Sequence, residues 1–312
     1  MNKQVYAAIT LAVGLGLSGC GGGGDGEATP VKALVPLAAA NYDSVAEASV
    51  SSVAGSDEVF STLDLATAAS TTTTPVSMAL LASGQPDALA RFALSQVKIK
   101  ATGRAKSAAV DTLTEFCAVS GALGVVFNDA DNDGDVSIGD RITVTASNCI
   151  EVTGQPAVNG TLSIGISSVA FNSLGDMTSG SLVIGFTQFS SAGLVLNGAA
   201  VLSISPSALG LDFDGLSASY GEQTRVYDFT VSANVNTNTV SVAGPITVNG
   251  STYVLATPSV IHTGTGHPVA GTLRISDGHG NRVDVLMGST SYTSYLYLKG
   301  DEVVDAYAEH NW

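Results

Sequence analysis

The stretch Thr161-Leu-Ser-Ile-Gly-Ile166 alternates small or polar residues with large apolar ones over six positions. Successive side chains of a β-strand point to opposite faces of a sheet, so this alternation predicts a strand with one buried and one solvent-facing side. The same pattern recurs from about residue 112 to residue 298. We expect further strands at Arg141–Thr145, Ser181–Phe186, Ala200–Ser205, Arg225–Val231, Ser251–Leu255, Gly271–Ile275, Arg282–Leu286 and Ser294–Leu298.

Turn signals separate these strands. Asn-Gly pairs, the strongest short signal for a β-hairpin, occur at residues 159–160, 197–198 and 249–250. Asp277–Asn281 is a further turn candidate, because it combines Asp, Asn and two glycines. The fold class predicted is mainly β: a long antiparallel meander curled into a barrel, half-barrel or sandwich, with one or two N-terminal helices.

The region before the strands has a different composition. Ser44-x-x-Glu47 resembles a capping box and predicts a short helix through Ser52. Pro86-Asp87 opens a second expected helix, which has one apolar face and is expected to cover an end or a face of the sheet. The four threonines in Ala68–Pro75 indicate a loop. We therefore divide the chain into a signal peptide (1–19), a flexible tether (20–40), a helical and low-complexity region (41–110) and an antiparallel β-domain (111–312).

Residues 129–140 read Asp-Ala-Asp-Asn-Asp-Gly-Asp-Val-Ser-Ile-Gly-Asp. Carboxylates at alternate positions supply the oxygen ligands that a calcium loop requires, and Gly134 stands sixth, where the chain turns sharply. Because Arg141–Thr145 has the alternation of a strand, we expect the loop to join two strands. The candidate ligands are Asp129, Asp131, Asp133, Asp135 through its carbonyl, Ser137 directly or through water, and Asp140 as the closing carboxylate.

These twelve positions resemble the calcium loops of EF-hand and dockerin modules. Position twelve is Asp140, as in dockerin-like loops, instead of the longer Glu of EF-hands. The resemblance implies Ca²⁺ binding, and outside the cytosol such sites are mostly structural, with dissociation constants of about 10⁻⁴ to 10⁻³ M. The alternative is an acidic, solvated turn.

Two cysteines, Cys117 and Cys149, bracket this loop. If the loop is the tip of a hairpin, they lie on its two arms and a cross-strand disulfide is geometrically plausible. The alternative is a pair of buried free thiols.

The N-terminus combines Lys3 with a short apolar run from Val5 to Leu17, too short for a mature transmembrane helix. Leu17-Ser18-Gly19-Cys20 resembles the bacterial lipobox, which implies cleavage before Cys20 and its lipidation, with acyl chains such as palmitate. The alternative is an ordinary secretory signal. No Asp directly follows Cys20, which favours the outer membrane, and the anchored chain could face the periplasm or the cell surface.

The chain carries a net charge of −15, from 27 acidic and 12 basic residues. This balance disfavours nucleic acid as a partner, since phosphate contacts need a basic surface.

The sequence contains few candidates for a catalytic site. The His262 and His267 pair lacks further metal ligands nearby, and Asp212 with Asp214 is better explained as a solvated strand end than as a carboxylate pair of a glycosidase. Tyr295 and Tyr297 share a face and could form an aromatic platform for sugar or peptide, although a packed sheet face explains them better.

The whole chain, with lipobox and calcium loop, resembles uncharacterised lipoproteins of Gram-negative bacteria, a resemblance to which no activity is attached. We expect a non-enzymatic, calcium-binding cell-envelope lipoprotein with a structural or interaction role. Its partners would be the outer membrane, through Cys20, and a lipid, glycan or protein ligand. The alternatives are a carrier that holds a lipid or other amphiphile on a concave apolar sheet, and a surface adhesin.

Overall fold

The computed structural model describes residues 35–52, 110–133, 136–150, 153–154, 156–173, 177–191, 193–263, 268–300 and 303–312. Ala33–Trp312 form one compact unit. The expected signal peptide, Cys20, most of the tether, the loop at Ala68–Pro75 and the helix after Pro86 lie outside the described residues. No helix in the described ranges is long and apolar enough to span a membrane.

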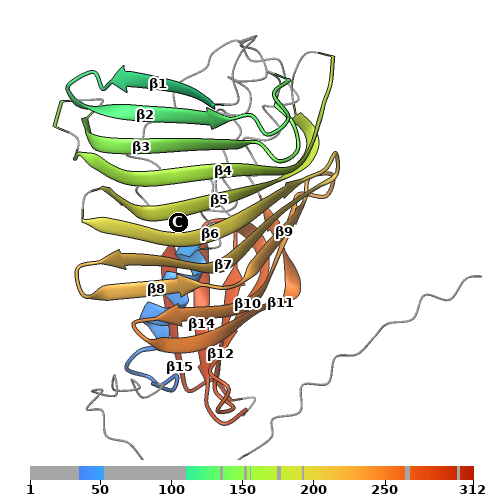
Figure 1. Cartoon of the computed structure of the whole chain (residues 1–312). Helices are drawn as coiled ribbons and strands as arrows, with labels where there is room; N and C mark the ends of the chain where they lie inside the picture. Colours follow the sequence, from blue (N-terminus) through green and yellow to red (C-terminus); the bar gives the residue numbers. More distant parts are fainter. Residues whose placement is uncertain are drawn as a thin grey trace, which may run out of the picture. The chain divides into compact units, whose positions relative to one another are not determined.

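The strands form one 15-stranded antiparallel sheet, in which strands adjacent in sequence are almost always adjacent in space (Figure 1). The expected meander is therefore confirmed. The strand order departs from this pattern at β9, which pairs with β7 and β10 beside β8. The strands are β1 Val110–Phe116, β2 Ser120–Asn128, β3 Arg141–Ile150, β4 Val158–Phe171, β5 Met177–Ser191, β6 Leu194–Ile204, β7 Ala208–Tyr220, β8 Gln223–Tyr227, β9 Thr230–Asn234, β10 Thr239–Val248, β11 Ser251–Thr263, β12 Pro268–Ser276, β13 Arg282–Met287, β14 Ser291–Tyr297 and β15 Ala306–Asn311.

One face of the sheet is apolar and buried. In β4, Leu162 and Ile164 are at most 1% exposed, whereas Thr161 and Ser163 on the other face are half-buried. The sheet is strongly curved (Figure 1). Among the described residues no pairing joins β15 back to β1. Alternation in the sequence thus assigns the buried face correctly.

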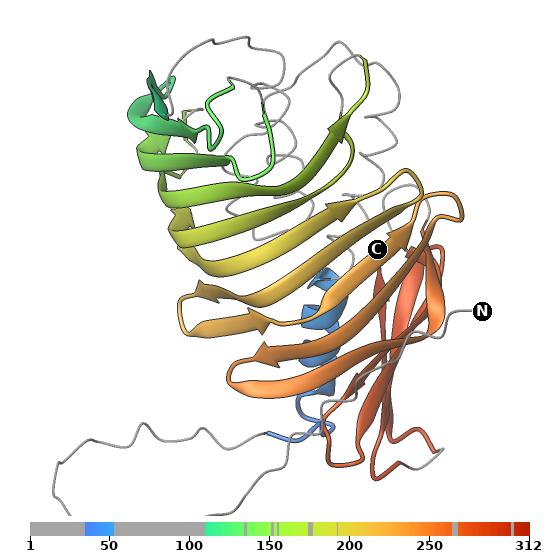
Figure 2. The same ribbon diagram turned by 45° about the vertical axis from the view of Figure 1, so that its right-hand side comes forward.

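Helical residues 42–52 lie inside the curl of the sheet. Figure 2 shows this helix between the yellow and orange strands on one side and the red strands on the other. Val45, Ala46 and Val50 are at most 4% exposed and belong to the same apolar core as the sheet.

The first helix is confirmed, but its predicted start is wrong. Ser44 lies inside the helix, and its hydroxyl donates to the carbonyl of Asn41 at 2.9 Å instead of capping an amide. Asn41 is the residue before the helix, and its carbonyl accepts from the amide of Val45 at 3.2 Å. Its side chain also accepts from the amide of Ala38 at 2.8 Å, so the chain turns into the helix three residues earlier than the capping-box pattern predicts.

Two of the four predicted turns are correct. Asn249-Gly250 joins β10 to β11, and Asp277–Asn281 joins β12 to β13. The pairs at 159–160 and 197–198 instead lie within β4 and β6, so the turns predicted there are wrong.

These two Asn-Gly pairs instead lie opposite β-bulges in the neighbouring strands and contact the bulged residues. Asn159 Oδ1 accepts from the amide of Asn148, and Asn197 Oδ1 accepts from the amide of Gln188, each at 2.8 Å. Asn148 and Gln188 both have positive φ and stand at register shifts. Gly160, at φ 99°, backs onto Gln188, whose carbonyl would lie 2.1 Å from an added Cβ. The Asn-Gly pairs therefore accommodate bends of the sheet, where bulges increase strand twist.

The strand predicted at Arg225–Val231 is two strands, β8 and β9, separated by Asp228 and Phe229. Tyr227, Phe229 and Val231 remain buried, so the side-chain alternation continues through the break. The ladder is interrupted because β10 carries Gly244, at φ 127°, and Pro245, which has no N–H to donate. Side-chain pattern alone could not reveal this interruption.

Candidate functional site

The acidic loop joins β2 to β3, as the sequence predicts. Asp129 directly follows β2 and Asp140 directly precedes β3, and the pairing of Asn128 with Arg141 closes the base of the loop. The loop is also tied to β4, because Gly139 donates to the carbonyl of Ile166 at 2.8 Å and Ile166 donates to that of Asp140 at 2.9 Å. The flanking strands thus hold both ends of the loop in place.

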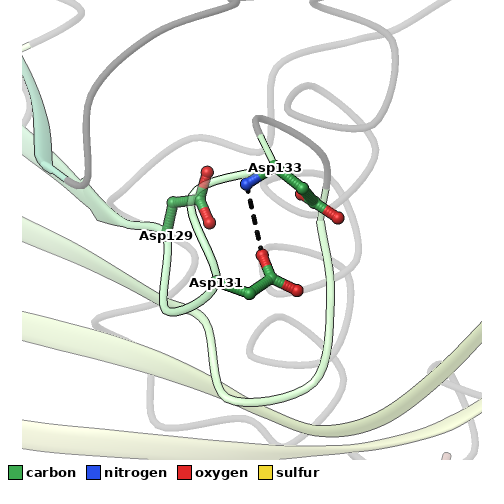
Figure 3. A group of neighbouring side chains, drawn as sticks. All are labelled: Asp129, Asp131 and Asp133. Carbon is green, nitrogen blue, oxygen red and sulfur yellow. Dashed lines mark hydrogen bonds between the residues drawn. The ribbon is translucent and has the colours of Figure 1, made fainter.

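Three carboxylates converge in this loop (Figure 3). Asp129, Asp131 and Asp133 each offer one oxygen, and these oxygens lie within 4.8 Å of one another. Asp129 is buried, and the other two are exposed. The amide of Asp133 donates to Asp131 at 3.3 Å, and that of Asn132 donates to Asp129 at 2.7 Å. Carboxylates held this close repel one another, and a hard cation with oxygen ligands would offset that repulsion.

The carboxylate of Asp140 accepts hydrogen bonds from backbone amides of the loop and is not free of partners like an open ligand position. It is fully buried, its Oδ1 accepts from the amide of Ala130 at 2.8 Å, and its Oδ2 accepts from that of Ser137 at 2.6 Å. Both oxygens are therefore engaged: Oδ1 ties the start of the loop to its end, and Oδ2 fixes the last turn of the loop. As a closing ligand, Asp140 would have to share or exchange these hydrogen bonds.

The remaining predicted ligands are partly placed. The hydroxyl of Ser137 donates to Asp131 Oδ2 at 3.0 Å, so it lies beside the acidic group. Asp135 and Gly134 lie outside the described residues. The structure thus brings together Asp129, Asp131, Asp133 and Ser137, with Asp140 beneath them.

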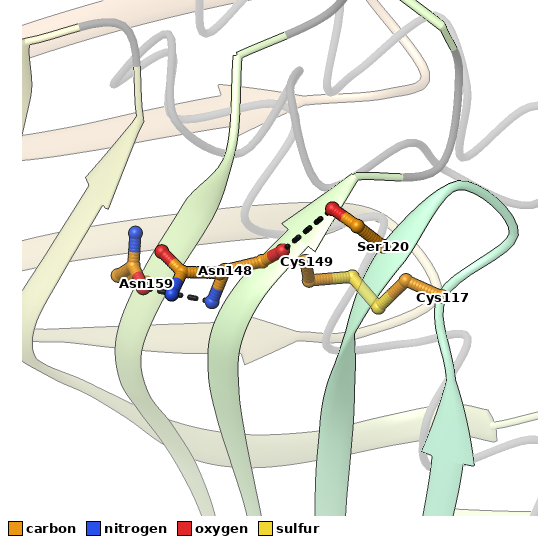
Figure 4. Close-up of a disulfide and its surroundings, with 5 residues drawn as sticks. All are labelled: Cys117, Ser120, Asn148, Cys149 and Asn159. Carbon is orange, nitrogen blue, oxygen red and sulfur yellow. Dashed lines mark hydrogen bonds between the residues drawn. A yellow bond between two sulfur atoms is a disulfide. The ribbon is translucent and has the colours of Figure 1, made fainter.

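The predicted disulfide is confirmed. Cys117 and Cys149 are bonded, with their Cα atoms 5.5 Å apart (Figure 4). Cys117 lies between β1 and β2 and Cys149 near the end of β3, so the bond closes the end of the β2–β3 hairpin opposite the acidic loop. Both ends of this hairpin are therefore cross-connected.

The other catalytic candidates of the sequence are not brought together. Asp212 and Asp214 share the exposed face of β7, and Asp212 accepts from the hydroxyl of Thr230 at 2.7 Å. His262 is exposed on β11, and His267 lies outside the described residues. His279 is exposed in the β12–β13 turn.

A buried carboxylate that sequence reasoning missed is Asp277. It accepts from the amides of Leu37 at 3.0 Å and His279 at 2.7 Å, and from both the amide and the side chain of Asn281. Burial raises the pKa of Asp277, but the hydrogen bonds from His279, Asn281 and Leu37 outweigh that effect and bring the pKa below its ordinary value. Asp277 thus holds the segment before the helix against the β12–β13 turn.

A second missed contact joins the helix to the last strands. His310 Nε2 lies 2.7 Å from Asp43 Oδ1, and the hydroxyl of Ser294 donates to the same oxygen at 3.3 Å. The His310 ring stacks on Tyr292, with ring centroids 4.8 Å apart. Ser294 is fully buried, and its hydroxyl also lies 3.4 Å from the carbonyl of Ala308, so these contacts join the helix to β14 and β15.

The tyrosines divide between the two faces of the sheet. Tyr292 is buried on the inner face, whereas Tyr295 and Tyr297 share the outer face, where they are half-buried. Tyr307 of β15 pairs with Tyr295, with ring centroids 6.3 Å apart, and is 71% exposed. Arg282 lies over the ring of Tyr297 at 4.2 Å. The outer surface of β13–β15 is therefore aromatic and accessible.

No protein-family model, curated protein or solved structure matches the chain.

Proposed function

We propose that the chain is a non-enzymatic, calcium-binding lipoprotein of the cell envelope, with a structural or interaction role. The observation that supports calcium binding is the convergence of the Asp129, Asp131 and Asp133 oxygens in a loop held at both ends by strands. Its carboxylate ligands suit Ca²⁺, which accepts flexible all-oxygen coordination. Asp140 supports the shape of the loop by accepting hydrogen bonds from the amides of Ala130 and Ser137.

The envelope location rests on the lipobox at Cys20 and is consistent with the disulfide, since disulfides persist in oxidising compartments. In this proposal Cys20 carries the lipid anchor in the outer membrane, facing the periplasm or the cell surface. The net charge of −15 argues against nucleic acid as a partner.

The test is the thermal unfolding of the full chain in EDTA and in millimolar CaCl₂. The expected result is a calcium-dependent rise in Tm, because a ligand that binds only the folded state stabilises it. With a Kd of about 10⁻⁴ to 10⁻³ M, 1 mM Ca²⁺ should stabilise the chain by about 0.4 to 1.4 kcal/mol. The Asp131→Asn/Asp133→Asn variant should lose the rise, since both side chains are exposed ligand candidates.

The control variant is Asp214→Asn/Glu222→Gln, which removes the same charge at two exposed positions away from the loop. It should keep the full calcium response. An equal response in both variants would show that calcium acts on overall charge and not at the loop. The absence of any response in the parent chain would reduce the loop to an acidic turn.

A surface interaction module is a second candidate, favoured by the exposed aromatic rings on β14 and β15. The carrier function needs an accessible apolar face. The inner-face residues Ile164, Leu182 and Ile184 are 0% exposed, so an amphiphile could reach them only after they are uncovered. The structure therefore favours an interaction role over a carrier role.

A further inference from the structure

The last strand of the sheet, β15, has one paired and one open edge. It pairs with β14 in regular antiparallel register from Ser291–Asn311 to Leu296–Ala306, with no bulge. Among the described residues no other strand pairs with it. Edge strands usually carry features that prevent pairing with another chain, such as proline, lysine or a bulge. The segment Ala306–Asn311 has none of the three.

The backbone groups at this open edge can be assigned from the hydrogen-bond pattern. The amide of Trp312 donates to the carbonyl of Thr290 at 3.2 Å, so this pair is a hydrogen-bonded one. In an antiparallel ladder such pairs alternate, so Ala306, Ala308 and His310 direct their N–H and C=O groups toward β14. Tyr307, Glu309 and Asn311 consequently direct theirs toward the open edge.

We propose that two copies of this chain pair through β15 in antiparallel fashion, about a two-fold axis at Ala308. In this register Tyr307 of each copy lies opposite Glu309 of the other, and their backbones exchange hydrogen bonds. Asn311 lies opposite Asp305 of the other copy, but the amide of Asp305 already donates to the carbonyl of Leu296 at 2.9 Å, so this pair forms one bond instead of two. The two-fold axis repeats both pairs, which gives about six interchain bonds. The sheet continues across the two-fold axis, and both copies contribute the same surface, as an isologous interface requires.

The side chains favour this register over the registers in which the two-fold axis is shifted by one residue. On the outer face the phenol of Tyr307 meets the carboxylate of Glu309, which can accept its O–H. On the inner face Ala308 lies opposite Ala308 of the other copy, and these two small side chains fit without moving any neighbouring side chain. An axis at Glu309 would oppose two carboxylates, and an axis at Tyr307 would oppose Asp305 to Glu309, both unfavourable pairings of like charge.

The exposed ring of Tyr307 adds to the interface. It is 71% exposed in the single copy, although its stack on Tyr295 already fixes its orientation. A pre-oriented tyrosine at the centre of a small patch is a typical energetic anchor of an interface. Because one strand pairing buries less area than a standard interface of about 1,200–2,000 Å², the dimer should be weak in solution.

The experiment is disulfide trapping in the full chain. Ala308 faces its own copy in a non-hydrogen-bonded pair, where Cα atoms lie about 4.5 Å apart, within the range that a disulfide spans. Ala308→Cys should therefore form a covalent dimer on mild oxidation at about 100 µM protein. The matched control is Ala306→Cys, on the same strand and face, which would lie opposite His310 of the other copy and should remain monomeric on non-reducing gels.

A second variant tests the backbone pairing without a thiol. Glu309→Pro removes an N–H that points to the open edge and leaves every β14–β15 backbone hydrogen bond in place. The one β14–β15 hydrogen bond that it removes among the described contacts is the exposed side-chain bond from the Ser291 hydroxyl to Glu309, at 3.2 Å. In sedimentation analysis it should weaken self-association at least tenfold, whereas Leu286→Lys, on the same outer face but two strands inward, should not. Equal trapping of the two cysteine variants, or undiminished association of a folded Glu309→Pro chain, would overturn the proposal. It uses neither the calcium loop nor Cys20, so its failure would leave the proposed function standing.

Discussion

The carboxylate of Asp277 should be one of the most important polar groups for stability. We consider Asp277→Ala, which removes an acceptor used by the amides of Leu37, His279 and Asn281 and by the Asn281 side chain. Leu37 is 1% exposed, so its amide would lose its acceptor with little access to water, at a cost of about 1–3 kcal/mol. The donors in the turn can reach water more easily and add about 1 kcal/mol in total. The expected loss is about 3 kcal/mol.

Urea unfolding at pH 7 measures this loss, with Asp212→Ala as the control. Asp212 is also an aspartate with one side-chain hydrogen bond, but it is exposed, so its loss should cost about 0.5 kcal/mol or less. Hydrogen exchange should locate the effect, with faster exchange in residues 35–52 of the Asp277→Ala chain than in the parent. A loss below about 1 kcal/mol, or unchanged exchange in this segment, would refute the reasoning.

The lowered pKa of Asp277 predicts that the stability of the chain depends on pH. Because hydrogen bonds hold the folded-state pKa of Asp277 below its ordinary value of 3.8, the unfolded chain binds the proton first as the pH falls. The contribution of Asp277 is therefore complete above this value and declines as the pH falls through 3.8 toward the folded-state pKa. The stability gap between parent and Asp277→Ala should narrow in that range. A stability gap that stays constant down to about pH 3 would contradict the direction of the pKa shift of Asp277 on folding.

Two further predictions concern the sheet. Gly160→Ala should lower the free energy of unfolding in urea by about 3 kcal/mol or more, because the new Cβ would lie 2.1 Å from the carbonyl of Gln188. The control is Gly154→Ala, which is also at positive φ but has nothing within 4 Å of its Cβ, and it should cost about 1 kcal/mol. Equal losses in the two variants would contradict the role assigned to Gly160 at the bulge. Replacing Cys117 and Cys149 by Ala should cost about 4 kcal/mol, from the loop entropy of a 32-residue separation, and a chain whose urea midpoint does not change would refute this.

Sequence pattern predicts those features of the fold that depend on local periodicity. The strands, the buried face and the loop between β2 and β3 follow from alternation, which directly reflects the two faces of a sheet. The disulfide is predictable because Cys117 and Cys149 bracket one loop, so that a hairpin over this segment brings them together. Hydrogen-bond register is less accessible, since Asn-Gly fits both a two-residue turn and the partner of a bulge. Both uses require positive φ at glycine, and only the neighbouring strand distinguishes them.

Contacts between distant segments could not be predicted in this way. Asp277 and Leu37 are 240 residues apart, and Asp43 and His310 are 267 apart. The sequence near Asp277 contains a recognisable turn, but nothing local indicates that its carboxylate has an oxygen left for a distant amide. The contacts within the acidic loop could not be predicted from the sequence either, although they join residues that are close in the chain. Its ligand pattern is readable, whereas the use of both Asp140 oxygens by backbone amides is a property of the folded loop.

The two ends of the sheet are held by different chemistry. The β1–β3 end depends on the disulfide and the acidic loop, and the β12–β15 end depends on Asp277 and on the Asp43–His310 contact with the helix. Neighbouring strands carry the only ladder contacts between these ends in the described residues, so a local loosening at one end need not reach the other. Calcium removal should therefore increase exchange in β2 and β3 without affecting residues 42–52, and Asp277→Ala should do the reverse. That separation would also explain how an open β15 edge could pair with a second copy while the acidic loop remains free to bind calcium.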